Sequence, residues 1–384
     1  MRIKKAFCYL FTLFVISCSN SDNIGNSDSE IINSDPNCNQ KVNISDENFK
    51  RKILSSTSLN GIAANSEHIV IKIDANDDGI VQVCEAEKVS FLNIDGSDIN
   101  SIEDLLSFRN LKTLSCRNNK IINLNVSTLK NLEYLYCDNN KLKSLNIQGL
   151  NNLKVLWCQY NELTTLNLSS LKSLEKVNFE FNQITDLNIS NSNNIKELKG
   201  YNNLITKLSI SHLTNLEYLN IAYNSLTSLD ASNLKKLIDL QCYSNKLKTL
   251  NVSNCTNLFY LNCDHNDLNN LYIDNCIKLS SLSCSANKLK TLFINDLTEL
   301  NDLDCSANLL TTLDIRNSQK LKYFSCYSNN LQTLIVKNGS DFSNYSIGAN
   351  PSLSSICCDQ SELADIQKEI KTLGYNCTVN TNCF

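Results

Sequence analysis

Apolar residues recur along most of the chain with a fixed period of 21 positions. The pattern starts at Leu111 with LKTLSCRNNKIINLNVSTLKN, and the same frame runs through eleven consecutive units without an insertion. A looser unit precedes them at 89–110, and a truncated one follows from Phe342. The consensus is LxxLxCxxNxLxxLxIxxLxx, in which the first leucine has offset 0. Such a strict frame predicts a repeat architecture.

Two apolar groups in each unit predict two short extended segments. Offsets 0, 3 and 5, and again offsets 10, 13 and 15, each contain a pair two positions apart, which suits a strand with one face turned inward. A single unit cannot bury its leucines, whereas stacked units share one continuous core. We therefore expect a repeat solenoid, an arc of short parallel β-strands with little helix outside two terminal caps.

The consensus resembles bacterial leucine-rich repeats, specifically the 21-residue class called IRREKO, which is common in envelope proteins of Bacteroidetes. The resemblance covers about 250 residues and implies a leucine-rich repeat domain at 89–358. It also implies that the outward strand residues line one continuous recognition face.

Asparagine fills offset 8 in every unit. Its amide carries both donors and acceptors, so we expect it to satisfy backbone groups of its own coil and of the neighbouring coil. The members are Asn119, Asn140, Asn161, Asn182, Asn203, Asn224, Asn245, Asn266, Asn287, Asn308, Asn329 and Asn350.

Cysteine fills offset 5 in eight units. Phe179, Gly200 and Ile221 replace it in the middle of the array, which indicates an apolar, inward slot where free cysteine acts as a small hydrophobe. Zinc is the rival interpretation, but it needs four ligands around one centre and the repeats contain no CxxC pair. The eight are Cys116, Cys137, Cys158, Cys242, Cys263, Cys284, Cys305 and Cys326.

Both ends of the array need caps, because a solenoid otherwise exposes its core. In the N-terminal cap, 38–88, the segment 44–55 predicts a helix with Ser45 or Asp46 as N-cap, and Cys38 and Cys84 could pair. In the C-terminal cap, 359–384, a helix is expected over 361–376, ending at Gly374. Its apolar face would hold Leu363, Ile366, Ile370 and Leu373. We also expect a disulfide, with partners left open, among Cys357, Cys358, Cys377 and Cys383.

Residues 74–85 match the pattern D-x-[DN]-x-[DN]-G-x5-E in every fixed position and resemble an EF-hand calcium loop. The resemblance implies one bound calcium ion, with Gly79 permitting the sharp turn. One departure is that HIVIKI before the loop predicts a strand where an EF-hand has a helix. The alternative is a plain surface turn. The implied ligands are Asp74, Asn76, Asp78, the carbonyl of Ile80, Gln82 and Glu85.

The first residues resemble a bacterial lipoprotein signal. Basic residues precede an apolar run over 6–16, which is too short to span a bilayer, and the run ends in Val-Ile-Ser-Cys18. The resemblance implies a signal peptide at 1–17, acylation of Cys18, and a flexible tether at 18–37. It places the protein in the bacterial cell envelope as an outer-membrane lipoprotein, and the acidic tether is similar to those of surface-exported lipoproteins. The alternative is an ordinary secretory signal with a coincidental cysteine.

Aromatic residues concentrate at offsets 2, 4, 6 and 7, the positions that the repeat family turns outward. Exposed aromatic residues on one mildly acidic face are typical of recognition sites. The alternative, that tyrosine is merely a good strand residue, would equally predict tyrosine at offsets 14 and 16, where only Tyr272 occurs. The candidate ligand-binding residues are Tyr134, Tyr136, Trp157, Tyr160, Phe181, Tyr201, Tyr218, Tyr223, Tyr243 and Tyr260.

Composition narrows the class of function. Lys and Arg (35) nearly balance Asp and Glu (39), which does not favour nucleic-acid binding. The chain has three histidines and none of the common catalytic motifs, so we expect a binding protein and not an enzyme. The leading hypothesis is recognition of a host or envelope protein, for example in adhesion. Glycan binding and a purely structural envelope role are the alternatives.

Overall fold

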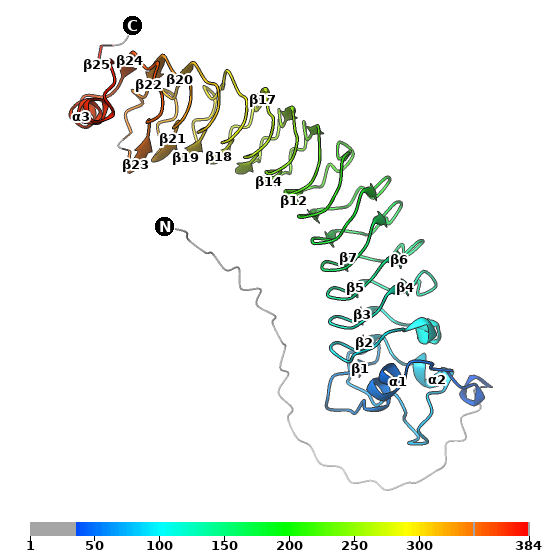
Figure 1. Cartoon of the computed structure of the whole chain (residues 1–384). Helices are drawn as coiled ribbons and strands as arrows, with labels where there is room; N and C mark the ends of the chain where they lie inside the picture. The colour runs from blue at the N-terminus through cyan, green and yellow to red at the C-terminus, as the bar shows by residue number, and fades with distance from the viewer. Residues whose placement is uncertain (1–35, 341, 383–384) are drawn as a thin grey trace. The chain divides into compact units, whose positions relative to one another are not determined.

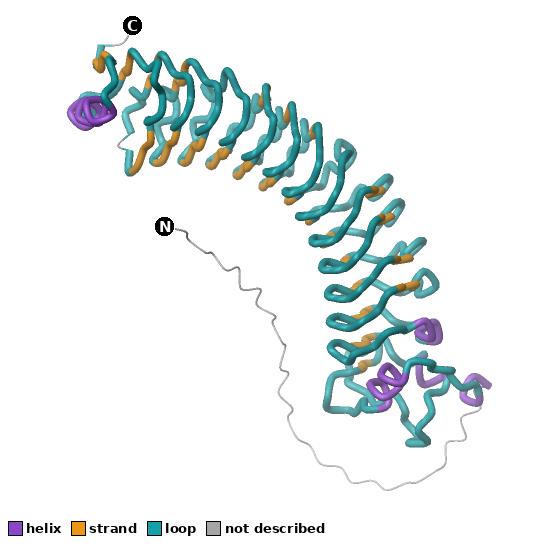
Figure 2. The backbone as a smooth tube through the Cα atoms, viewed as in Figure 1, coloured by secondary structure: helices purple, strands orange, loops and turns teal. Residues whose placement is uncertain are grey.

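The computed structural model describes residues 36–340 and 342–382, which fold as one curved solenoid (Figure 1). Its concave side carries a 14-stranded sheet in which one short strand of each coil pairs with the same strand of the next coil (Figure 2). All pairs are parallel and in register except the first, β1 with β2, which is antiparallel. The predicted solenoid of short parallel strands is thereby confirmed. The strands are β1 (Ala63–Ala64), β2 (Phe91–Asn93), β3 (Thr113–Ser115), β5 (Tyr134–Tyr136), β7 (Val155–Trp157), β9 (Lys176–Asn178), β11 (Glu197–Lys199), β12 (Tyr218–Asn220), β14 (Asp239–Gln241), β16 (Tyr260–Asn262), β18 (Ser281–Ser283), β19 (Asp302–Asp304), β21 (Tyr323–Ser325) and β23 (Asn344–Ser346).

The second extended segment of each coil lies on the convex side and pairs less regularly. Its strands form four separate sheets, with no strand over 201–210 or 288–294. Curvature gives the physical reason: coils spread apart on the outside of an arc, and the backbone bonds of a sheet need strands about 4.8 Å apart. The strands are β4 (Asn123–Asn125), β6 (Ser144–Asn146), β8 (Thr165–Asn167), β10 (Asp186–Asn188), β13 (Leu229–Asp230), β15 (Thr249–Asn251), β17 (Asn270–Tyr272), β20 (Thr312–Asp314), β22 (Thr333–Ile335), β24 (Ser355–Cys357) and β25 (Thr378–Asn380).

The asparagines at offset 8 form the predicted ladder, and Asn287 is representative. Its Nδ2 donates to the carbonyl oxygen of Cys284 in its own coil at 3.1 Å and to that of Cys263 in the preceding coil at 3.0 Å. Its Oδ1 accepts a bond of 3.0 Å from the backbone N–H of Leu268. Each amide therefore joins two coils at the point where the chain leaves the concave strand, and satisfies backbone groups that the turn would otherwise leave unpaired.

The cysteines at offset 5 are free thiols buried in the core, as the sequence predicts. Burial raises the pKa of Cys326 to about 12, so this thiol stays protonated at neutral pH. Several thiols donate weak hydrogen bonds to backbone carbonyls, such as Cys305 Sγ to Ser325 O at 3.4 Å.

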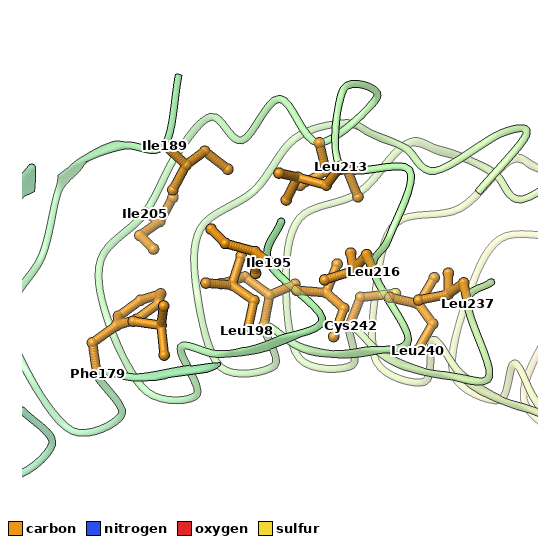
Figure 3. Packing of buried hydrophobic residues seen from close by; sticks show 14 of the residues in the cluster. Phe179, Ile189, Ile195, Leu198, Ile205, Leu213, Leu216, Leu237, Leu240 and Cys242 are labelled. Carbon is orange, nitrogen blue, oxygen red and sulfur yellow. The ribbon is translucent and has the colours of Figure 1, made fainter. Parts of the chain in front are cut away.

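In the middle of the array, other residues replace cysteine at offset 5. Phe179 is fully buried, and an added Cβ at Gly200 would lie 2.3 Å from its ring atoms and 2.9 Å from Ile221 Cδ1. Glycine in one coil thus makes room for the phenylalanine of the preceding coil. Figure 3 shows Phe179 and Cys242 inside coils of the same core.

Most of the helical residues lie in the two caps. In the N-terminal cap, Asp46 is the N-cap of α1 (Glu47–Leu54), because its Oδ1 accepts from the backbone N–H groups of Asn48 and Phe49 at 2.9 Å. Ser45 binds Asp104 instead. Cys38 and Cys84, whose pairing the sequence left open, form a disulfide. The other short helices are η1 (Pro36–Asn39), α2 (Val83–Ala86) and η2 (Glu103–Ser107).

At the C-terminal end, α3 (Leu363–Leu373) ends at Gly374, whose φ is +71°, as predicted. Ile366 and Ile370 are buried against the last coils, whereas Leu373, expected on the same face, is 36% exposed. The cap also adds β25, which pairs in parallel with β24. Cys357 is disulfide-bonded, while the thiols of Cys358 and Cys377 are free, and Cys383 lies outside the described residues.

Candidate functional site

The concave surface is built from offsets 2 and 4 of each strand, because offset 3 points into the core. In β5, for example, Leu135 is buried and its neighbours Tyr134 and Tyr136 are partly exposed. Offsets 6 and 7 lie beyond the strand, in the turn that follows it. The ten candidate aromatic residues therefore divide between the sheet and its adjoining edge, and they do not form one uniform row.

Five rings from the turns form one continuous group, the five-ring cluster: Tyr160, Phe181, Tyr201, Tyr223 and Tyr243. Tyr160 and Phe181 are stacked with centroids 4.5 Å apart and planes within 9°. Contacts of 5.2, 5.1 and 5.5 Å then link Phe181 to Tyr201, Tyr201 to Tyr223, and Tyr223 to Tyr243. Tyr160 and Tyr223 remain 49% and 48% exposed. The cluster is an aromatic platform open to solvent.

The backbone at offset 7 makes this platform unusual. Its φ is positive in every regular unit, and Tyr160, Phe181 and Tyr223 have φ of 55°, 52° and 53°. The left-handed region costs a non-glycine residue roughly 1–2 kcal/mol, and a bulky side chain there is uncommon. Other units place asparagine, serine, histidine or alanine at this offset. Strand propensity therefore cannot explain the rings at these turn positions.

The cluster offers hydroxyl donors as well as ring faces. Burial raises the pKa of Tyr243 to about 12, and it also raises the pKa of Tyr201. Both phenols are therefore neutral at physiological pH and can donate hydrogen bonds.

A second group, the arginine cluster, consists of Arg117, Tyr136, Asp138 and Trp157. Arg117 Nε lies 2.9 Å from Asp138 Oδ1, and the guanidinium carbon lies 4.4 Å and 4.9 Å from the ring centroids of Tyr136 and Trp157. Tyr136 and Trp157 meet edge to face at 5.2 Å. The rings of Tyr136 and Trp157 thus contact the guanidinium group of Arg117. The repeat pattern alone did not indicate this contact.

Tyr134, Tyr218 and Tyr260 lie on the sheet at offset 2, where Tyr134 is close enough to Tyr136, and Tyr260 to Tyr243, for their hydroxyls to interact electrostatically. Lys154 Nζ lies 6.0 Å from the ring centroid of Tyr134. Register pairs Tyr218 and Tyr260 with Asp239 from either side. The structure thus brings together five of the ten candidates, pairs two with Arg117, and places these three on the sheet.

In the loop at 74–85, carboxylates accept hydrogen bonds from backbone N–H groups of the same loop. Asp74 accepts from the backbone N–H of Gly79 at 3.0 Å. Glu85 accepts from those of Ala75 and Gln82 at 2.7 and 3.0 Å. Asp74 and Glu85 are each 5% exposed. The preceding segment holds only an isolated bridge between Ala64 and Val70, where the sequence predicted a strand.

This loop could bind calcium only if carboxylate, carbonyl and amide oxygens together act as the ligands. Within 36–340 and 342–382, no three acidic, histidine or cysteine side chains gather closely enough to hold a metal by themselves. Carbonyl and amide oxygens from Ile80, Asn76 and Gln82 would have to complete the shell. A carboxylate oxygen that accepts one N–H keeps a further lone pair, so the bonds to Asp74 and Glu85 do not block coordination.

Cys18, the expected acylation site, lies outside the described residues. Within the described part of the chain, no helix is long and apolar enough to cross a membrane.

Comparison with solved structures shows the leucine-rich repeat fold. The functional domain of InlJ from Listeria monocytogenes, which includes a cysteine ladder, is 24% identical, with a TM-score of 0.65 over 83% of this chain and 75% of that chain. The Drosophila Toll–Spätzle complex gives 20% identity and a TM-score of 0.51 over 78% of this chain and 49% of that chain. The internalin InlF from Listeria monocytogenes gives 18% identity and a TM-score of 0.49 over 86% and 98%. Neither protein-family models nor curated protein sequences gave a match.

The chain is therefore a leucine-rich repeat solenoid, and a bacterial protein, InlJ, is among its structural neighbours. Identities of this size establish the fold alone.

Proposed function

We propose that this protein is a non-catalytic receptor or adhesin that binds a protein partner through the five-ring cluster. The observation that carries the proposal is the placement of Tyr160, Phe181 and Tyr223 at turn positions with positive φ, a backbone conformation that disfavours bulky residues. Structural stability would favour asparagine there, as in other units.

A protein partner suits the chemistry of the cluster. Tyrosine and tryptophan are enriched at protein interfaces because they bury a large area with few rotatable bonds. Ring stacking holds the platform rigid before binding, which lowers the entropic cost of association. The neutral hydroxyls of Tyr201 and Tyr243 add directional hydrogen bonds.

Capture from envelope and host extracts with matched variants tests this proposal. The full-length protein is compared with Tyr201→Ala/Tyr223→Ala and with Lys246→Ala/Lys248→Ala, which lie at offsets 9 and 11 of one unit. We expect a protein that the wild type and the lysine variant retain and the ring variant loses. The same protein retained equally by all three would contradict the proposal. A glycan array on the same variants checks the alternative, since ring-dependent glycan binding without a protein partner would favour a lectin.

We also propose that Cys18 is the acylated N-terminus of an envelope lipoprotein exposed through its tether. Support comes from the apolar run and the Ser-Cys18 junction that follows it. Two or more acyl chains anchor a protein stably, whereas one binds only marginally. Mass spectrometry of the mature protein should find acyl chains on Cys18, and Cys18→Ala should leave the membrane fraction. A mature N-terminus at another residue would overturn this assignment.

For the loop at 74–85 we propose one bound calcium ion in the N-terminal cap. The support is its complete oxygen pattern and the buried carboxylates of Asp74 and Glu85. Calcium at about 100 times its Kd should raise the free energy of unfolding by about 2.7 kcal/mol. Asp74→Asn/Glu85→Gln should abolish that rise, while magnesium should give little. Equal melting temperatures with calcium and with EDTA would refute the site.

A further inference from the structure

Charge is distributed unevenly along the concave face. Offsets 2, 4, 6 and 7 of the units from 111 to 215 hold three acidic residues and three basic residues. Each of these bases is paired on the face itself: Arg117 with Asp138, and Lys176 and Lys199 with Glu197. The first half of the face is therefore neutral.

The second half, called here the acidic half, carries no basic residue of its own at these offsets. The same offsets in the units from 216 to 341 carry four acids and neither lysine nor arginine: Asp239, Asp264, Asp302 and Asp304. Hydrogen bonds from serine side chains or backbone N–H groups satisfy Asp264 and Asp304. Burial raises the pKa of Asp239, while a hydrogen bond of 3.2 Å from Gln241 Nε2 and the positive charge of Lys199 act to lower it. Burial, together with repulsion from Asp304, raises the pKa of Asp302, so this environment disfavours the charged form of Asp302.

The strand register places a tyrosine ring beside each of the least satisfied carboxylates. Asp239 of β14 lies between Tyr218 of β12 and Tyr260 of β16. Asp302 of β19 pairs with Tyr323 of β21, which is 46% exposed. Partners in a sheet lie about 4.8 Å apart, so one side chain can touch both the ring and the carboxylate.

Farther along, the same stretch of the face is hollowed. A cavity of about 210 Å³ opens over β19, β21 and β23. Asp302, Asp304 and Tyr323 line it, together with the polar side chains of Asn344 and Ser346.

The arginine cluster shows within this molecule what a ring next to a carboxylate holds. There, Arg117 lies over Tyr136 and forms an ion pair with Asp138. Combining ring-face attraction with a charge-assisted hydrogen bond is the usual way of recognising a guanidinium or ammonium group. Asp302 and Tyr323 repeat this combination of carboxylate and ring, and the same offsets of the acidic half hold no lysine or arginine.

We propose that the acidic half binds a basic segment of the protein partner, with an arginine or lysine side chain seated in the hollow formed by Asp302, Asp304 and Tyr323. The inference rests on the proposed function and specifies its partner: a protein with an exposed run of basic residues. The five-ring cluster, on the adjoining edge, then contacts the apolar part of the same partner.

Fluorescent hexa-arginine, hexa-lysine and hexa-glutamate peptides test the proposal on the full-length protein. We expect the two cationic peptides to bind and the anionic one to fail. Asp302→Asn/Asp304→Asn should weaken cationic binding about tenfold or more, the scale of losing a charge-assisted hydrogen bond. A matched control, Asp274→Asn/Asp296→Asn, changes net charge equally outside the concave face and should alter affinity less than about twofold.

Three outcomes would overturn the inference: no cationic binding, equal loss in both double variants, or full affinity in the concave variant. Melting curves check that each variant is folded. We expect both variants to fold because asparagine has nearly the same shape as aspartate. Tyr323→Phe should bind like the wild type, and Tyr323→Ala should bind more weakly, if the ring face holds the cation. If the peptides fail while Tyr201→Ala/Tyr223→Ala still loses a captured protein, this inference is wrong and the proposed function stands.

Discussion

The interior and the concave surface of the same coils differ in how much they change from one unit to the next. Asparagine recurs at offset 8 in every unit, whereas offset 2 holds residues as different as Lys176, Tyr218 and Asp239. The interior repeats because every coil leaves the same backbone groups to be satisfied. No such demand acts on the concave surface, so its residues are free to suit a partner. We therefore expect interior substitutions to lower stability and surface substitutions to lower affinity.

The largest expected effect is on the interior, at Gly200. Gly200→Ala would place a methyl group 2.3 Å from the Phe179 ring and should lower the free energy of unfolding by about 3 kcal/mol, as overpacking does. Chemical denaturation measures this loss. Phe179→Cys/Gly200→Cys restores the residues found in flanking coils and should recover most of the stability. A Gly200→Ala protein as stable as the wild type would show that the middle core is loosely packed.

The asparagine ladder comes next. Asn287→Ala leaves the carbonyls of Cys263 and Cys284 and the N–H of Leu268 without their partner, and should cost about 1–3 kcal/mol of unfolding free energy. Asn269→Ala is the control, because its exposed amide makes only a 3.5 Å bond to Asp267 O. Equal melting temperatures for the two variants would contradict the ladder's role in stability.

The surface should behave in the opposite way. Tyr223→Asn replaces a ring by a residue that tolerates positive φ, so the gain in backbone energy offsets lost ring contacts of about 0.5–1.5 kcal/mol. Stability should change by less than about 1 kcal/mol, while affinity for the captured partner falls by about 2 kcal/mol, as at interface hot spots. Titration calorimetry and denaturation on one preparation measure both. A large loss of stability would mean that the ring serves the fold.

The smallest effects are expected away from the concave face. Lys248→Ala and Lys290→Ala remove exposed charges at offset 11 and should change affinity by less than about 0.5 kcal/mol. Surface plasmon resonance with the captured partner resolves such changes. If these variants lose binding while Tyr223→Asn keeps it, the recognition surface lies on the other side of the coil.

The sequence determined the framework because the framework depends on local repetition. The 21-residue frame predicted the stacked coils, the bonds of the asparagine ladder and the buried thiols, and local signals predicted the helix that ends at Gly374. The pairing of Cys38 with Cys84 was open in the sequence and was settled by the fold of the cap. One further signal was readable: asparagine, which fills offset 7 at Asn118, Asn139 and Asn202, is typical of a left-handed turn.

Only the tertiary structure decided which side chains meet across coils. Periodicity assigns a residue to a face, but not the direction of a long side chain, so it could not separate the five-ring cluster from Tyr136 and Trp157, whose rings hold Arg117. It could not show that Gly200 yields space to Phe179, because the contact joins two coils. Curvature likewise broke the convex strands into four sheets, since the spacing of coils is a property of the whole stack. The sequence of each unit repeats, so it predicts what all coils share. Contacts between neighbouring coils depend on the residues of both coils, and these contacts decide which side chains the surface presents.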